Sequence, residues 1–236
     1  MEDGVVRGMT EPLKIDVWSD IACPWCYLGT RRLQAGVREY RAAGGDRDVV
    51  VEYHSYELAP DTPVDFTGSE VDFLARHKGM DEGQVREMLG RMTELGAQEG
   101  LAYDFDALQH TRTLKAHQVL HLAKTRGAQL ALVERLFAAY FEEGRHVGRD
   151  EALADLAAEV GLDRDEVLRA LADETYADAV DADLAQARAY GISGVPFFVV
   201  EERYGISGAQ EPAVFARVLA TVTDEQASLA AGSDTV

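Results

Sequence analysis

Two cysteines, Cys23 and Cys26, are the residues of this 236-residue chain whose type and spacing most clearly suggest chemistry. They are its only cysteines, and Pro24 and Trp25 separate them. A structural zinc site needs four ligands, and no second CxxC follows. A disulfide across so short a loop would stabilise the fold very little. The spacing therefore favours a redox-active dithiol, with a chance pair of buried thiols as the plain alternative.

The elements around the cysteines support the redox interpretation. Residues 13–18 alternate apolar and polar side chains, which predicts a strand, and residues 25–40 have helical periodicity. Pro24 suits the first turn of that helix, so Cys23 is expected at its N-terminus, where the helix dipole favours a thiolate. Cys26 lies one turn further in and is expected to be the less accessible, resolving thiol. Ser19 and Asp20 are interpreted as turn or cap residues.

The remaining pattern predicts an α/β fold with a long helical insertion. Residues 48–58 and 197–201 are typical of strands, and 204–207 completes a hairpin with the latter. Nearly everything from 69 to 189 is helical in pattern, and a last helix is expected at 212–221. The order β-α-β, helices, β-β-α is that of a thioredoxin-like core. We therefore expect a discontinuous thioredoxin-like domain (13–62 and 190–222), an inserted helical domain (63–189), a flexible extension (1–12) and a flexible tail (223–236).

Four stretches carry a resemblance to a known family. They are DVWSDIACPWCYLG at 16–29, LFAAYF at 136–141, GISGVPFFV at 191–199 and YGISGAQ at 204–210. Together they resemble the DsbA-like thioredoxin family in its FrnE-like branch, over nearly the whole chain. The resemblance implies a thioredoxin-like fold and a thiol–disulfide oxidoreductase, which exchanges disulfides through a mixed disulfide on Cys23 that Cys26 resolves.

The same resemblance implies a substrate site around the dithiol. It implies a cis bond between Val195 and Pro196, in a loop beside the cysteines. The backbone of Val195 would bind an extended substrate peptide by strand addition. Pro24 and Trp25 would tune the pair, and Trp25 would offer an aromatic surface to apolar substrates. Expected substrates are proteins or small molecules with thiols or disulfides, and neither a metal nor a nucleotide is required. Glutathione is compatible as reductant or co-substrate.

Two other functions stay open at this point. Relatives of the family include 2-hydroxychromene-2-carboxylate isomerases and kappa-class glutathione transferases, in which a serine commonly replaces the first cysteine. The presence of both Cys23 and Cys26 argues against such a glutathione-dependent isomerase or transferase, which is the alternative function. A non-catalytic binding or chaperone module is the third.

The histidines give weaker signals. His117 and His121 are four apart on a predicted helix, a spacing that can bind metal, but no third ligand is evident. We therefore interpret both as packing or surface histidines. Arg112 stands where the family usually has asparagine. Nothing in the sequence distinguishes His54 or His77.

Composition excludes several classes of partner. The chain has 23 Lys and Arg against 42 Asp and Glu, a net charge of −19, which argues against nucleic acid and anionic membranes. No window approaches the roughly 18 apolar residues of a membrane span. Residues 1–13 do not resemble a secretory signal, so a cytoplasmic protein is expected. A homodimer through the helical domain is compatible with the resemblance.

Overall fold

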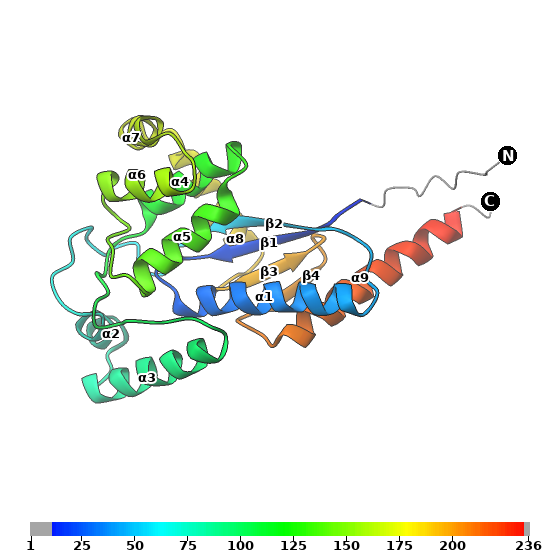
Figure 1. Ribbon diagram of the computed structural model, residues 1–236, viewed down its shortest axis with the longest axis horizontal. Helices are drawn as coiled ribbons and strands as arrows, with labels where there is room; N and C mark the ends of the chain where they lie inside the picture. Colours follow the sequence, from blue (N-terminus) through cyan, green and yellow to red (C-terminus); the bar gives the residue numbers. More distant parts are fainter. Residues whose placement is uncertain (1–10, 234–236) are drawn as a thin grey trace.

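A four-stranded mixed sheet forms the centre of the molecule (Figure 1). The computed structural model describes residues 11–233, so most of the predicted extension at 1–12 lies outside the described residues. The strands are β1 (Leu13–Ser19), β2 (Val49–Ser55), β3 (Phe197–Val200) and β4 (Tyr204–Ser207), in the order β2-β1-β3-β4. β1 pairs parallel with β2 and antiparallel with β3, and β4 returns antiparallel to β3. The thioredoxin-like α/β arrangement predicted from the sequence is confirmed.

Helices α1 (Pro24–Ala42) and α9 (Pro212–Ser233) pack against each other and against one face of this sheet. Leu13, Ile15 and Val17 of β1 are fully or almost fully buried in the same cluster. Alternate residues of a strand point to one face, so this spacing directs the apolar side of β1 toward the two helices. The packing is close, because a Cβ on Gly36 would lie 2.5 Å from Cβ of Phe215.

The last helix is longer than predicted, and the expected flexible tail at 223–236 is helical as far as Ser233. Residues 223–233 contain several good helix formers. Three contacts also tie the start of this segment to the core. The Tyr40 hydroxyl hydrogen-bonds Thr223 at 2.9 Å, the Tyr204 hydroxyl donates to Glu225 at 2.6 Å, and the Gln226 amide donates to Glu201.

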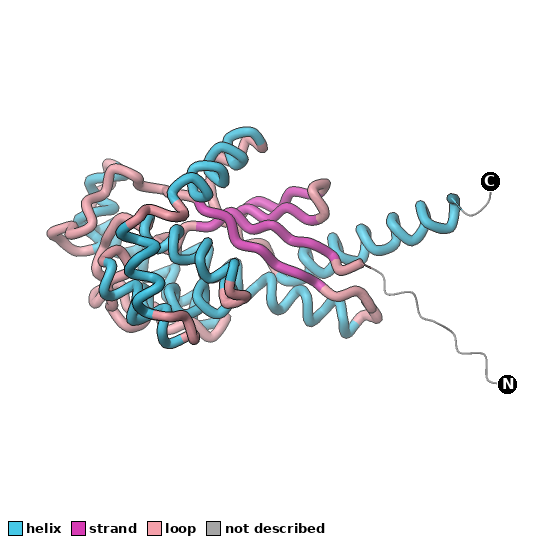
Figure 2. The backbone as a smooth tube through the Cα atoms, turned by 90° about the horizontal axis from the view of Figure 1, so that it is seen from above, coloured by secondary structure: helices cyan, strands magenta, loops and turns pink. Residues whose placement is uncertain are grey.

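The insertion between β2 and β3 is helical, as predicted, and gathers at one end of the sheet (Figures 1 and 2). Its helices are α2 (Glu70–Lys78), α3 (Glu82–Gln98), α4 (Leu114–Thr125), α5 (Gln129–Phe141), α6 (Asp150–Glu159), α7 (Arg164–Ala172) and α8 (Ala177–Ala189). Ser69 and Asp81 each begin a helix with a capping box. Within residues 11–233, no helix combines the length and apolar character needed to cross a membrane.

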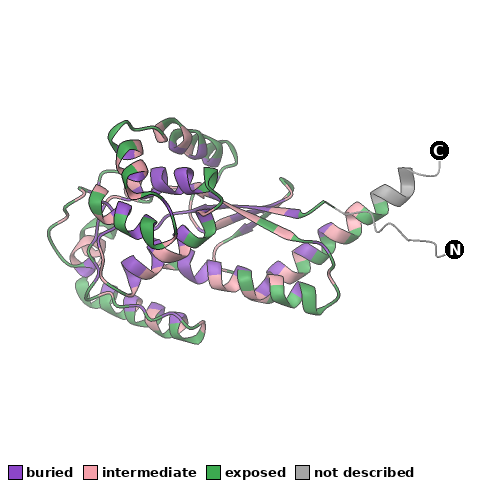
Figure 3. Ribbon diagram, turned by 45° about the horizontal axis from the view of Figure 1, so that its top comes forward, coloured by how far each residue is buried: buried purple, intermediate pink, exposed green. Residues whose placement is uncertain are grey.

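The insertion shares its hydrophobic core with the thioredoxin-like part, and buried residues run from one into the other (Figure 3). The Tyr27 ring on α1 stacks on Phe137 of α5, with ring centroids 5.0 Å apart. The Tyr103 hydroxyl, from the segment before α4, donates to the Pro24 carbonyl at 2.6 Å. The insertion therefore holds the first turn of α1 in place.

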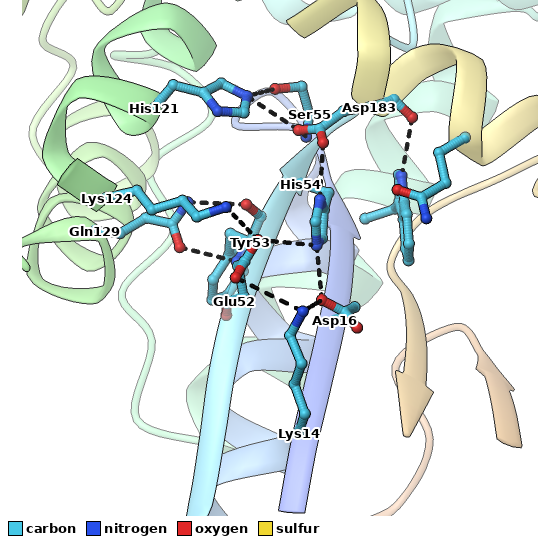
Figure 4. Close-up of polar contacts among 12 residues, drawn as sticks. Lys14, Asp16, Glu52, Tyr53, His54, Ser55, His121, Lys124, Gln129 and Asp183 are labelled. Carbon is cyan, nitrogen blue, oxygen red and sulfur yellow. Dashed lines mark hydrogen bonds and ion pairs between the residues drawn. The ribbon is translucent and has the colours of Figure 1, made fainter. Parts of the chain in front are cut away.

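Side chains of the insertion also cover the outer edge of β2 (Figure 4). The Gln129 amide accepts from the Tyr53 N–H at 3.0 Å and donates to the Tyr53 carbonyl at 2.8 Å. Asp183 of α8 accepts from the Ser55 N–H at 2.7 Å. At Tyr53 and Ser55 these contacts take the place of a neighbouring strand, which protects this end of the edge from pairing with another chain.

Candidate active site

Cys23 is the N-cap residue of α1, and Pro24 occupies the first turn, as the sequence predicted. Cys23 has an extended backbone, and its carbonyl accepts from the Cys26 N–H at 3.0 Å. Both cysteines are free thiols, 4 % and 1 % exposed, and Cys23 is the one that lines an open cleft. The geometry gives the two thiols different access to a substrate.

The loop before β3 brings Val195 and Pro196 to this helix end. The Val195–Pro196 bond is cis, as the resemblance implied. The Cys23 Sγ donates to the Val195 carbonyl oxygen at 3.6 Å. The predicted neighbours Cys23 and Val195, separated by 172 positions in the chain, are therefore in contact.

The two thiols also differ in acidity. Complete burial, together with the hydrogen bond and charge of Cys23, raises the pKa of Cys26 well above its ordinary value. Contacts with Ser19 and with the Asp20 backbone oppose this shift but do not outweigh it. Cys26 is therefore a protonated, buried thiol at neutral pH.

Asp20 is more than the turn residue expected from the sequence. It accepts from the Ala22 N–H at 3.1 Å, which is the predicted turn contact. It also accepts from the Leu58 N–H and the Thr113 hydroxyl, both at 2.7 Å, and lies 3.6 Å from Nε2 of His117. Burial alone would raise the pKa of Asp20, but these contacts outweigh it and the pKa is lowered. An ionised Asp20 thus joins the turn before Cys23 to the insertion.

The histidines lie in polar contacts that the sequence did not reveal. His117 is buried and lies near Asp20, in agreement with its interpretation as a packing or surface histidine. His121 lies 3.0 Å from Asp183 and 3.1 Å from the Ser55 hydroxyl. Arg112, at the position where the family usually has asparagine, pairs with Glu57 at 3.0 Å.

His54, which nothing in the sequence distinguished, links the sheet to α8 (Figure 4). Its two ring nitrogens lie 2.8 Å from carboxylate oxygens of Asp16 and Asp183. Its ring stacks on Trp18 with centroids 4.5 Å apart. Burial alone would lower the pKa of His54, but the two carboxylates raise it to about 9. His54 is therefore an imidazolium at neutral pH.

Asp16, Glu52 and His54 also bring three metal-ligating types of side chain within 4.8 Å of one another. Lys14 Nζ lies 3.0 Å from Asp16 and 3.8 Å from Glu52, and Lys124 contacts Glu52 as well. Lysine ammonium groups therefore already balance these carboxylates. We interpret this cluster as part of the contact between the sheet and the helical insertion, and not as a metal site.

A cleft of about 210 Å³, open to solvent, lies between the start of α1 and the α2–α3 hairpin. Cys23, Pro24 and Trp25 line one side of it, and Trp25 is 45 % exposed. The first cysteine therefore borders a space that a substrate can enter.

A thioredoxin-like sheet, a CPWC sequence at a helix N-terminus, an adjacent cis-proline loop and a helical insertion define a thioredoxin-fold thiol protein of the DsbA type. Residues 14–220 match the model of the DSBA-like thioredoxin domain, and the chain belongs to that family.

Known proteins agree with this assignment. The probable DsbA oxidoreductase of Streptomyces coelicolor is 38 % identical, with a TM-score of 0.82 over 90 % of this chain and 91 % of that one. The uncharacterised protein YwbO of Bacillus subtilis is 28 % identical over 90 % of this chain and 96 % of its own length. A 2-hydroxychromene-2-carboxylate isomerase is 16 % identical, with a TM-score of 0.70 over 92 % and 98 %. The last likeness concerns the fold alone.

Proposed function

We propose that this protein is a thiol–disulfide oxidoreductase in which Cys23 is the nucleophile and Cys26 the resolving thiol. The contact of the Cys23 Sγ with the Val195 carbonyl, at the edge of an open cleft, is the observation that carries the proposal. It puts a sulfur at a helix N-terminus beside a backbone group able to align a substrate.

The proposed reaction has two exchanges. The Cys23 thiolate attacks one sulfur of a substrate disulfide, forms a mixed disulfide and releases the other substrate sulfur as a thiolate. Cys26 then loses its proton and attacks the Cys23 sulfur, which releases the second substrate thiolate. The protein is left with a Cys23–Cys26 disulfide, and two electrons have passed to the substrate. The reverse sequence oxidises a dithiol.

The high pKa of Cys26 gives the two steps their order. A protonated Cys26 does not compete with Cys23 for the substrate disulfide, because the thiolate is the attacking species. Formation of the mixed disulfide removes the charge on Cys23, one of the causes that keep the Cys26 pKa high. Cys26 thus becomes easier to deprotonate when its attack is needed.

Single-cysteine variants test this proposal with a protein disulfide such as insulin and a thiol reductant. Cys23→Ser is expected to abolish catalysis, whereas Cys26→Ser is expected to accumulate a mixed disulfide that mass spectrometry detects. Unchanged insulin reduction by Cys23→Ser would contradict the proposal.

The apolar and aromatic lining of the cleft beside Cys23 favours a second candidate, a glutathione-dependent isomerase or transferase acting on a small molecule. In that case Cys26 has no chemical role, because no internal disulfide forms. A glutathione-dependent conversion that survives Cys26→Ser would support this second candidate over the first.

The direction of electron flow depends on the cellular partners. A cytoplasmic location, which is part of the proposal, would supply reducing thiols and keep the pair reduced between turnovers. The protein would then reduce substrate disulfides, with glutathione among the suitable electron donors.

A further inference from the structure

A buried histidine in the cleft has no role in the proposed exchange. His110 is 4 % exposed, and its Nδ1 lies 2.8 Å from a carboxylate oxygen of Glu70 and 3.3 Å from the Tyr140 hydroxyl. Its Nε2 has no hydrogen-bonding partner among the described residues. An unpaired buried nitrogen costs free energy unless a ligand or water satisfies it. His110 and Glu70 both line the cleft that holds Cys23.

The wall of the cleft around His110 is apolar and aromatic. The Phe73 ring stacks on His110, with centroids 3.4 Å apart, and the His77 ring also stacks on Phe73, with centroids 5.1 Å apart. Apolar side chains from α2, α3 and the loop after β2 complete the wall: Leu58, Leu74, Met88, Leu89 and Met92. Methionine sulfur and aromatic faces both make favourable contacts with a planar ring.

One positive charge at this cleft is free. Of the two carboxylates that line it, Asp20 faces His117 and Glu70 faces His110. Lys78 also lines it, and no carboxylate of the described residues lies within 4.0 Å of its ammonium group. Lys14, Lys115 and Lys124, in contrast, are all ion-paired. Lys78 is exposed in the last turn of α2, so its ammonium group is able to pair with an anionic group of a molecule in the cleft.

We propose that the cleft binds a small-molecule substrate, namely a thiol or disulfide with an aromatic or similarly apolar body and an acidic group. This inference rests on the proposed function and names its substrate class. The apolar body packs on Phe73 and the α3 methionines, and Lys78 pairs with the acidic group. The His110 Nε2, which neighbouring side chains cover, hydrogen-bonds a polar atom of the substrate once these side chains shift. The substrate sulfur then lies beside Cys23.

Dithiobis(nitrobenzoate), an aromatic dicarboxylate disulfide, is a suitable probe, and neutral aliphatic hydroxyethyl disulfide is its reference. With either compound, the Cys23 thiolate forms a mixed disulfide and releases one thiolate. Cys26 then releases the second and closes the internal disulfide. The selectivity ratio is the rate constant for dithiobis(nitrobenzoate) divided by the rate constant for hydroxyethyl disulfide, each measured by stopped flow on the reduced protein. A change in thiol reactivity affects both rate constants, so the ratio reports recognition of the substrate.

Two variants and a matched control test the assignment. Lys78→Gln is expected to lower the selectivity ratio about 3-fold, the scale of one exposed ion pair. His110→Gln, which keeps a donor for Glu70, is expected to lower it about 5-fold, the scale of one ordinary hydrogen bond. Arg76→Gln removes a charge from the same helix outside the cleft and is expected to leave the ratio unchanged.

The outcomes separate this proposal from the function it rests on. Equal slowing of both disulfides, or an unchanged ratio in Lys78→Gln and His110→Gln, would overturn the substrate class and leave the redox function intact. Failure of the wild type to react with either disulfide would overturn both.

A binding measurement without redox chemistry gives an independent test. In the Cys23→Ser/Cys26→Ser variant, para-nitrobenzoate should quench Trp25 fluorescence in a saturable manner, because Trp25 lines the cleft. Lys78→Gln should weaken this binding, and Arg76→Gln should not. Saturable quenching that Lys78→Gln leaves unchanged, or no saturable quenching, would contradict the proposal.

Discussion

Gly29 lies so close to Pro196 that a Cβ atom at position 29 would be 2.9 Å from Cγ of the proline. The same Cβ would be 3.2 Å from the Phe198 ring. The absence of a side chain thus lets α1 approach the loop that carries Val195. Cys23, the N-cap residue of the same helix, lies about 1.7 turns before Gly29.

Gly29→Ala should therefore separate the loop from the dithiol. Overpacking of this kind lowers the free energy of unfolding by about 1–3 kcal/mol. We expect the rate of insulin reduction to fall as well. Gly90→Ala on α3 is the matched control, because a Cβ there meets no atom within 4 Å. It should leave the rate unchanged and raise stability by up to about 1 kcal/mol. Equal effects of the two substitutions on the rate would contradict this account.

The two cysteines should differ in alkylation. In the reduced native protein, iodoacetamide is expected to modify Cys23, which lines the cleft, and to spare Cys26, whose pKa is raised by burial and by Cys23. Peptide mapping after a short reaction measures this difference, and unfolded protein, in which both react, is the control. Preferential modification of Cys26 would reverse the roles assigned here.

Asp20 should be a positioning residue for the turn before Cys23. Asp20→Asn removes the charge that faces His117 and weakens contacts to Leu58 and Thr113, so a loss of about 3 kcal/mol in the free energy of unfolding is expected. Thr113→Val removes a single hydrogen bond and should cost about 1 kcal/mol. Chemical denaturation measures both losses, and a larger loss for Thr113→Val would contradict the central place given to Asp20.

The contact of His54 with Asp16 and Asp183 should make stability depend on pH. The folded pKa of His54, about 9, is above its unfolded value of about 6.5. The contribution of His54 to the free energy of unfolding is therefore complete below pH about 6.5 and is lost as the pH rises through 9. The free energy of unfolding of the wild type should exceed that of His54→Gln by an amount on the order of 3 kcal/mol at pH 6, and by much less at pH 10.

Denaturation at the two pH values, with the His54 ring signal followed by NMR, checks this prediction. The His77→Gln variant is the control, since His77 is exposed and lies outside this contact. A difference between wild type and His54→Gln that grows with pH would contradict the assigned protonation of His54.

Local patterns in the sequence were sufficient for the dithiol and the elements beside it. Cys23, Pro24 and Cys26 are neighbours in the chain, and the alternation in β1 and periodicity in α1 place them at a helix start. The contact with Val195 came from the resemblance, because 172 positions separate the two residues and no local pattern joins them.

The polar contacts that join the two parts of the molecule could not be predicted in the same way. Asp20 and Thr113 are 93 positions apart, and His54 and Asp183 are 129 apart. Each residue alone is compatible with a turn, a cap or a surface, and only the docking of the insertion buries it. One signal was available, since His121 lies within a run of apolar residues, where a buried polar side chain needs a partner.

Cys23 and Cys26 are expected to form a reversible redox pair, and equilibration of the protein with a glutathione redox series is the measurement that decides this. Trp25 fluorescence and the loss of two hydrogens by mass should report one two-electron transition, absent from Cys23→Ser. A midpoint above about −200 mV would indicate an oxidant and one below about −250 mV a reductant. A wild-type protein that shows no transition across the series, with both thiols still free, would contradict the account.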